Sequence, residues 1–196
     1  LKLLPLRYGS RTLISCRDLS IRYGDRAVCG PFSFTLEQGE RLALNGKNGS
    51  GKSSLLKLIL GEDIKKTRTI SIGSGLIISY VSQDTSHLSG TLSDYASQCR
   101  IDESLFKAIL RKLDFERIQF TKDMAQFSGG QKKKVLIAQS LCEQAHLYLW
   151  DEPLNFIDIY SRMQIEQLIL DFRPTMIFVE HDRAFRETIA TKTLEL

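Results

Sequence analysis

The glycine-rich run at residues 46–53 limits the fold of this 196-residue chain more than any other stretch of its sequence. It reads Gly-Lys-Asn-Gly-Ser-Gly-Lys-Ser and fits the spacing G-x-x-x-x-G-K-[ST] of a phosphate-binding loop. A short apolar strand is predicted before it at 41–45. After it, leucines and isoleucines at helical spacing predict a helix that ends near Gly61. Because this motif needs a strand before it and a helix after it, the run predicts a site for a nucleoside triphosphate.

Each residue type in the run has a chemical use. Glycines let the backbone turn tightly, so that its N–H groups surround an anion at the start of the next helix. The ammonium of Lys52 suits the β- and γ-phosphates, and the hydroxyl of Ser53 suits Mg²⁺. The residues predicted to bind the nucleotide here are Asn48, Gly49, Gly51, Lys52, Ser53 and Ser54.

Composition predicts a soluble domain in the cytoplasm. The chain has the length of one domain, with 42% hydrophobic and 26% charged residues. It has neither a signal-peptide pattern nor an apolar run near the roughly 20 residues that cross a membrane. The four cysteines are scattered, which favours reduced thiols over metal ligands. The net charge of +4 is only a weak indication of polyanionic partners.

Hydrophobic periodicity predicts an α/β fold with a mostly parallel, covered sheet and an antiparallel side sheet near the N-terminus. Strands are predicted at 13–21, 32–36, 69–73, 76–82, 147–150 and 175–179, and helices at 131–142 and around 165–172. A small helical insert is expected over 84–127. We expect one domain over 1–196, in which the basic segment 1–11 is the end of a linker and the whole is a piece of a longer protein.

Two carboxylates follow the predicted strand at 147–150. Asp151 at the end of such a strand is suited to hold Mg²⁺, and Glu152 is placed to polarise an attacking water as a general base. The alternative is a solvated acidic turn. We favour the site because open α/β sheets bind their ligands at the carboxyl ends of the strands.

A second glycine turn, Ser128–Gln131, precedes the helix predicted at 131–142. Glycine N–H groups and the helix dipole at this point can bind an anion, although the same residues also serve as an ordinary helix cap. Three lysines follow, Lys132, Lys133 and Lys134, and we interpret them as a solvated face of the helix.

Together these residues resemble the ABC (ATP-binding cassette) ATPase family over nearly the whole chain. The run 46–53 matches the Walker A motif, 147–152 matches Walker B with its catalytic glutamate, and 128–131 matches the signature motif. Four further positions correspond to family motifs: Tyr23 to the adenine-stacking aromatic, Gln83 to the Q-loop, Asp158 to the D-loop and His181 to the switch histidine.

The resemblance implies a mechanism that uses ATP and Mg²⁺. Two cassettes pair head to tail, so that Ser128 and Gly130 act on a nucleotide held by a partner cassette. Asp158 of the D-loop is a further implied nucleotide-binding residue. Glu152, His181 and Gln83 are the implied catalytic residues. The implied Mg²⁺ ligands are Ser53, Gln83 and Asp151. A lone copy is expected to bind ATP and to hydrolyse it poorly.

The stretch 151–158 resembles the F subfamily, whose members carry two cassettes on one chain and act on the ribosome. The form Pro-Leu-Asn-Phe-Ile-Asp-Ile-Tyr-Ser-Arg at 153–162, with Ser-Gly-Gly-Gln-Lys-Lys-Lys at 128–134, resembles one group more closely still. This group is the second cassette of F-type proteins that give resistance to lincosamides, pleuromutilins and streptogramin A. Phe127 replaces the leucine that usually opens the signature, while Leu154, Phe156 and Ile157 depart from the general F-type pattern. The alternative is the ATPase subunit of a membrane transporter, with a membrane partner. A DNA-maintenance ATPase is a remote third.

Overall fold

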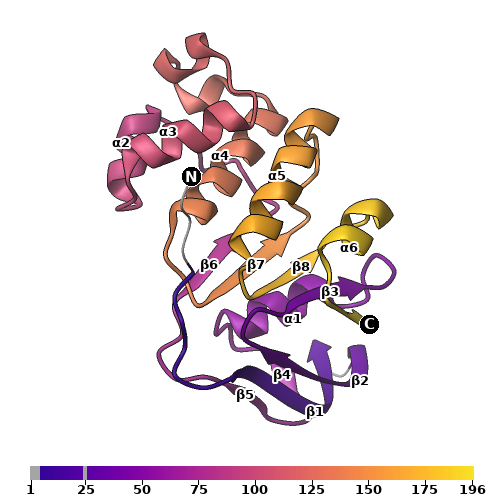
Figure 1. Cartoon of the computed structure of the whole chain (residues 1–196). Coiled ribbons are helices and arrows are strands. Elements are labelled where there is room, and N and C mark those ends of the chain that lie inside the picture. Colours follow the sequence, from indigo (N-terminus) through magenta and orange to yellow (C-terminus); the bar gives the residue numbers. More distant parts are fainter. Residues whose placement is uncertain (1–4, 24–25) are drawn as a thin grey trace.

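Two β-sheets face each other across one helix in the computed structural model, which describes residues 5–23 and 26–196 (Figure 1). The side chains of residues 23, 26 and 27 lie outside the described part. The smaller sheet is formed by β2 (Arg26–Glu37), β1 (Thr12–Tyr23) and β4 (Lys65–Lys66), with β5 (Ile70–Ile72) also paired to β1. All its pairings are antiparallel, as predicted for the side sheet.

Alternation along β2 shows why this sheet has one dry face. Phe32, Phe34 and Leu36 are buried, while the intervening Ser33 and Thr35 are exposed. Side chains of a strand point alternately to opposite faces, so the apolar set packs inward as one layer. The sequence prediction for these residues is confirmed.

The larger sheet has the strand order β6-β7-β8-β3-β9, and every neighbouring pair in it is parallel. Its strands are β6 (Ile78–Val81), β7 (Leu147–Asp151), β8 (Met176–Val179), β3 (Arg41–Asn45) and β9 (Lys192–Glu195). Leu147 and Leu149 belong to the core shared with the side sheet, whereas Tyr148 and Trp150 belong to the core on the opposite face. A strand that is buried on both faces has a continuous apolar sequence, and this pattern predicts β7.

Helix α1 (Lys52–Ile59) fills the space between the two sheets, and its buried leucines join the same core as Leu147 and Leu149. The opposite face of the parallel sheet is covered by α4 (Gly129–Cys142), α5 (Ile159–Phe172) and α6 (Arg183–Ile189). Burying one large apolar side chain stabilises the fold by roughly 1.5–3 kcal/mol, so both cores contribute strongly.

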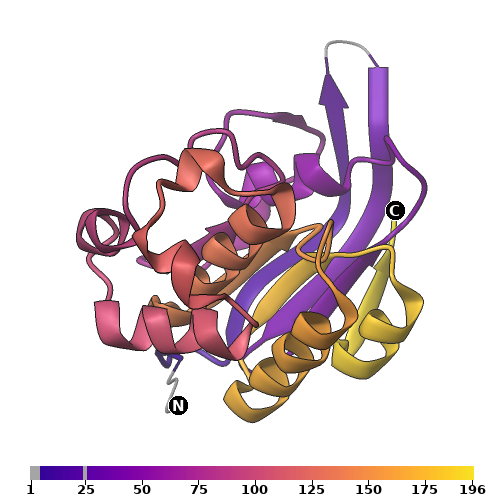
Figure 2. The same cartoon turned by 90° about the horizontal axis from the view of Figure 1, so that it is seen from above.

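The small helical insert of the predicted fold is present. It holds α2 (Leu92–Gln98), α3 (Glu103–Lys112) and two short 3₁₀ turns, η1 (Arg117–Thr121) and η2 (Met124–Gln126). Thr91 caps α2 and Asp102 caps α3 through side-chain oxygens that accept from backbone N–H groups. Seen from above, the insert and α4 lie on one side of the molecule, and α6 with β9 lies on the other (Figure 2).

Three elements were not predicted: β4, α6 and β9. Each is short, so its hydrophobic pattern is too brief to stand out from a loop. Helix α4 also begins at Gly129, two residues before the predicted start, because Ser128 rather than a later residue caps it. The four cysteines are free, in line with the expected reduced thiols. Within the described residues, no helix combines the length and the apolarity that a membrane span needs.

Candidate nucleotide-binding site

The glycine-rich loop joins the end of β3 to the start of α1, the setting that its sequence predicts. Gly51 has a φ of +97° and forms the N-cap of α1. A Cβ atom at this position would lie 2.6 Å from the sulfur of Cys29 on β2. Since both the left-handed φ and this contact exclude a side chain, glycine is required here. The helix begins without a side-chain cap, and its first N–H groups face the loop.

The Lys52 side chain stabilises the shape of this loop. It is 7% exposed, and its ammonium nitrogen donates to the carbonyl oxygens of Gly46 and Lys47, both at 2.8 Å. An ammonium has three N–H donors, so one remains for an incoming phosphate. Ser50 Oγ in the same loop, close to Gly46, is buried and has no hydrogen-bond partner among the described residues. Buried polar atoms are rarely unpaired, which indicates that the loop is built to receive a further polar group.

The predicted phosphate-binding residues surround one hollow of about 350 Å³. Its lining consists of Val28, Asn48, Gly49, Gly51, Lys52, Ser53, Ser54, Gln83 and Glu152. The fold thus brings the loop together with Gln83, which follows β6, and with Glu152, which follows β7. Both strands end at the same edge of the parallel sheet, where such folds bind ligands.

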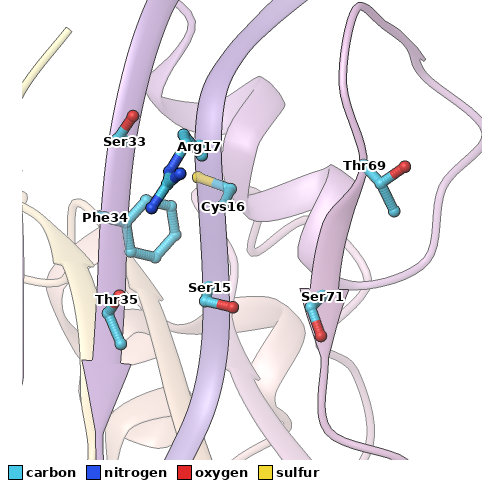
Figure 3. A pocket seen from close by; sticks show the side chains of 8 residues that line it. All are labelled: Ser15, Cys16, Arg17, Ser33, Phe34, Thr35, Thr69 and Ser71. Atoms are coloured by element: carbon cyan, nitrogen blue, oxygen red, sulfur yellow. The ribbon is translucent and has the colours of Figure 1, made fainter.

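A second hollow, of about 570 Å³, lies on the side sheet and contains no predicted site residue. Hydroxyl side chains line it, among them Ser15 on β1, Ser33 and Thr35 on β2, and Ser71 on β5, together with the guanidinium of Arg17 (Figure 3). Its size alone does not mark it as the functional site, because it lacks the helix terminus and the carboxylate of Glu152 that line the loop hollow.

Asp151 and Glu152 are held in different ways. Asp151 is 3% exposed, and its Oδ1 accepts a hydrogen bond from Nε2 of Gln83 at 3.0 Å. Glu152 has a left-handed φ of +48°, which turns the chain directly after β7. One of its oxygens accepts from Nδ2 of Asn155 at 2.7 Å, and the other lies 3.2 Å from Nε2 of His181. Gln83 with Asp151 and His181 with Glu152 therefore form two bonded pairs that meet at neighbouring positions of the chain.

Glu180 is a neighbouring residue that the sequence analysis missed. It is 5% exposed, and its carboxylate accepts hydrogen bonds from the backbone N–H groups of Leu154 and His181, at 3.1 and 2.7 Å. It thus fixes the loop after β8 against the loop after β7, which sets the distance between Glu152 and His181. A carboxylate directly after a buried apolar strand was the pattern that could have revealed it, as it revealed Asp151.

The signature turn forms a standard helix cap. Ser128 Oγ accepts from the N–H of Gln131 at 3.3 Å, and the Gln131 side chain accepts from the N–H of Ser128 at 3.0 Å. Gly130 packs against the backbone of the D-loop, so that a Cβ there would lie 2.4 Å from the carbonyl oxygen of Phe156. The Phe156 side chain itself is 86% exposed. The signature and D-loop of this chain are therefore in direct contact.

Asp158 caps α5 and pairs with the signature helix. Its carboxylate accepts from the N–H of Ser161 at 2.8 Å and lies 2.8 Å from the ammonium of Lys134. Partial burial would raise the pKa of this carboxyl, but the hydrogen bonds from Lys134 and Ser161 outweigh it and hold the pKa well below its usual value. Ser128, Gly130 and Asp158 are absent from the lining of the loop hollow.

The prediction of a solvated lysine face on α4 is wrong. Lys133 is 2% exposed and Lys134 is 8% exposed; only Lys132 is half-buried. Lys134 is paired with Asp158, and Lys133 donates to the carbonyl oxygen of Ser82 at 2.9 Å. A run of like charges is normally solvated, but here a helix turns two of its three members toward buried oxygen acceptors.

The remaining predicted residue, Tyr23, ends β1, and its side chain lies outside the described part of the chain. Mg²⁺ prefers oxygen ligands and usually takes few of them from the protein when it binds with phosphates. The described residues contain no group of three or more His, Cys, Asp or Glu side chains that could hold a metal by themselves. Ser53, Gln83 and Asp151 supply a hydroxyl, an amide and a carboxylate around a phosphate site, and this donor set fits Mg²⁺.

The parallel sheet with its phosphate-binding loop, flanking acids and helical insert defines a P-loop ATPase domain. The family described as ABC transporter matches residues 29–155, and the chain belongs to this family. It is therefore an ATP-binding domain of the ABC type, and hydrolysis of ATP follows from that membership.

Curated relatives match nearly the whole chain. ATP-binding protein Uup of Caulobacter vibrioides is 30% identical over 96% of this chain and 32% of its own length. ABC transporter F family member 2 of Arabidopsis thaliana is 28% identical over 96% of the chain and 29% of its own length. Ribosome protection protein VmlR of Bacillus subtilis is 27% identical over 94% of the chain and 34% of its own length. The chain spans about a third of the length of these relatives, and its resemblance to F-type ABC proteins is confirmed.

Solved structures agree with the fold. One described as the structure of the ATP binding subunit of an ABC transporter superposes with a TM-score of 0.78 at 25% sequence identity, covering 94% of this chain and 86% of that one. The predicted α/β fold, with its parallel sheet, side sheet and helical insert, is thus confirmed as that of an ABC nucleotide-binding domain.

Proposed function

We propose that this chain is one ATP-hydrolysing cassette of an F-type protein that acts on the ribosome in the cytoplasm. The observation that carries the proposal is the turn after β7, where Asn155 of the F-like stretch binds the carboxylate of Glu152 at 2.7 Å. Transporter cassettes usually have a small residue, Ser or Thr, in this region, whereas the amide here contacts the candidate general base. The similarity to the ribosome protection protein VmlR supports the same conclusion.

In this proposal the phosphates of ATP lie on the N–H groups of residues 48–54, with the free N–H of Lys52 on the β- and γ-phosphates. Tyr23 stacks on the adenine. Ser53, Gln83 and Asp151 would hold Mg²⁺, which would neutralise phosphate charge. The hydrogen bond from the Gln83 amide to Asp151 keeps two of these donors in register.

Glu152 takes a proton from the attacking water. At the same time the water oxygen bonds to the γ-phosphorus, and the bond between the γ-phosphorus and ADP breaks. Nε2 of His181 lies 3.2 Å from the carboxylate, where it orients Glu152 and is placed to contact the γ-phosphate. Asn155 holds the other carboxylate oxygen. The residues of this chain therefore act mainly by positioning and by electrostatics.

A second cassette completes each site. Ser128 and Gly130 sit at a helix N-terminus outside the loop hollow, which suits an anion brought by another cassette. Asp158 lies beside them on the same surface through its ion pair with Lys134. We propose that residues 1–196 are one domain of a two-cassette chain, that 1–11 are the end of the linker and that 84–127 are the helical subdomain.

The finer proposal is protection of the ribosome against lincosamides, pleuromutilins and streptogramin A. It rests on the stretch Pro-Leu-Asn-Phe-Ile-Asp at 153–158 and on the relative named as a ribosome protection protein. Expression of the full-length protein is expected to restore growth on these drugs, and Lys52→Ala is expected to abolish that growth because the loop then lacks its phosphate-facing cation.

The test is sedimentation of the full-length protein carrying Glu152→Gln, with ATP, on a gradient that separates ribosomes from membranes. Glu152→Gln keeps the ATP-bound state by removing the general base, so it should travel with ribosomes. Lys52→Ala is the matched control and should stay at the top of the gradient. If neither variant is found in the ribosome fractions, the ribosomal role is refuted.

A membrane-transporter ATPase is the second candidate, favoured by the similarity to the ATP binding subunit of an ABC transporter. The same gradient separates the two functions. Recovery of the Glu152→Gln protein with the membrane fraction, and loss of that recovery on membrane extraction, would favour the transporter and identify a membrane partner.

A further inference from the structure

Lys133 is a buried cation that has no role in the proposed mechanism. It is 2% exposed on α4, whereas its neighbour Lys132 is half-buried. An ammonium is costly to bury unless hydrogen bonds and opposite charges compensate it. Burial lowers the pKa of Lys133, and the carboxylates of Asp151, Glu152 and Glu180 act in the opposite direction. The cation therefore lies in the field of the acids that surround the nucleotide site.

The contact of Lys133 lies one residue before the Q-loop glutamine. Its ammonium nitrogen donates to the carbonyl oxygen of Ser82 at 2.9 Å, directly after β6. Ser82 also closes a turn through its hydroxyl, which donates to the carbonyl oxygen of Asp84 at 2.6 Å. Gln83, between these two residues, reaches Asp151 with its side-chain amide at 3.0 Å. The position of the Gln83 backbone thus depends on a hydrogen bond from α4.

The same helix starts at the signature motif. Ser128 caps it, and Gly130 lies against the carbonyl of Phe156 with no room for a side chain. A helix moves as a rigid unit, so a displacement of its first turn also displaces Lys133, one turn further along. Lys133 is therefore the contact that joins the partner-facing end of α4 to this chain's own ATP site.

We propose that Lys133 is a positioning residue, which transmits engagement of Ser128 and Gly130 by a partner's nucleotide to Gln83. The proposal rests on the proposed pairing of two cassettes. Because Lys133 is absent from the lining of the loop hollow, it should affect turnover and leave nucleotide affinity unchanged. The coupling passes through one hydrogen bond, so removal of that bond should uncouple Gln83 from the signature helix.

The experiment is a double-mutant cycle on the full-length protein with Lys133→Met and Gln83→Ala. Methionine keeps the unbranched apolar stem of lysine and removes the terminal ammonium with its charge and donors. Loss of a hydrogen bond from a charged donor corresponds to about a 10- to 100-fold fall, which we expect in kcat while the nucleotide Kd stays within about twofold. If Lys133 acts through Gln83, the double variant should be no slower than Gln83→Ala alone.

Lys132→Met is the matched control, one position away on the same helix, and should leave kcat unchanged. Lys133→Arg keeps the charge and the donors and should recover most of the loss. Should Lys133→Met fold poorly by thermal unfolding, Lys133→Gln replaces it in the cycle, since its amide is one bond too short to reach Ser82. The proposal would be overturned if the falls in kcat of the two single variants multiplied in the double variant. It would also be overturned if Lys133→Met raised the nucleotide Kd by as much as it lowered kcat.

The proposed function and this inference can fail separately. If Glu152→Gln retains normal turnover, the assignment of the catalytic base fails. If Glu152→Gln abolishes turnover while Lys133→Met retains it, only the role of Lys133 is lost.

Discussion

Nε2 of His181 lies 3.2 Å from Oε1 of Glu152, although 29 positions separate the two residues in the sequence. The contact joins the loops after two neighbouring parallel strands, β7 and β8. Glu180 fixes the distance between these loops, because its carboxylate binds backbone N–H groups of both. The candidate base is therefore oriented by contacts within this chain.

Glu152→Gln is expected to slow ATP turnover at least ~100-fold, in line with the loss of a general base, while nucleotide affinity stays the same. The amide keeps the size of the side chain, and one end of it can still accept from Asn155. Single-turnover rates and a nucleotide titration on the full-length protein would measure the two effects separately. A variant that hydrolyses ATP at the normal rate would assign the base to another group.

Asn155→Ala removes the hydrogen bond that holds Oε2 of Glu152. Hydrogen bonds to charged groups contribute roughly 1.5–3 kcal/mol, so we expect kcat to fall at least about tenfold with no change in nucleotide Kd. Asn155→Asp is the sharper comparison, because a second carboxylate would repel Glu152 and should lower kcat further. Equal activity of the wild type, Asn155→Ala and Asn155→Asp would mean that Asn155 does not orient the base.

Gly130→Ala and Gly129→Ala form a matched pair. A methyl group at Gly130 would lie 2.4 Å from the carbonyl oxygen of Phe156, whereas one at Gly129 would lie 3.4 Å from a ring carbon of Phe156. We expect Gly130→Ala to lower the free energy of unfolding by about 1–3 kcal/mol and to impair turnover, since it displaces the D-loop. Gly129→Ala should be neutral or slightly stabilising in the helix. Urea unfolding of both variants checks this, and equal losses would contradict the close approach.

Asp158 is expected to make the stability of the folded state depend on pH in the acidic range. Its folded-state pKa is held below the unfolded value of about 3.9, so its contribution is present above that value and is lost as the pH falls through the folded pKa. Asp158→Asn keeps a good helix cap and removes the charge opposite Lys134. We expect the wild type to be more stable than Asp158→Asn near neutral pH, with the difference shrinking toward about pH 3. A constant difference across this range would exclude the ion pair as its source.

The parallel sheet, the phosphate-binding loop and the acids after β7 could be predicted from the sequence. Each rests on a strong local pattern, such as the apolar run 147–150 that ends in two carboxylates. The short elements α6 and β9 could not be predicted in this way. They are stable because they pack on the finished sheet, as Phe185 and Ile189 of α6 do, and not because of a pattern of their own.

The polar contacts around the site show the same limit. Asn155 stands three residues after Glu152 in the sequence, but its contact depends on the left-handed turn at Glu152, which no sequence pattern announces. The lysines of α4 were misread for a related reason. A run of charged side chains is exposed to solvent only when no carboxylate or carbonyl oxygen lies opposite it. Here the carbonyl oxygen of Ser82 and the carboxylate of Asp158 lie opposite the lysines, and both come from segments distant in the sequence.

The hydrogen bonds from Lys52 to the carbonyls of Gly46 and Lys47 have a consequence for the kinetics of nucleotide capture. A loop whose shape is held by its own hydrogen bonds does not have to fold around the phosphates, so encounter and capture should occur in one step. In stopped-flow experiments the observed association rate should then rise in proportion to ATP concentration, without the plateau that a slow ordering step imposes. The cassette would therefore exchange nucleotide as fast as dissociation allows, and any slow phase would report the meeting of two cassettes.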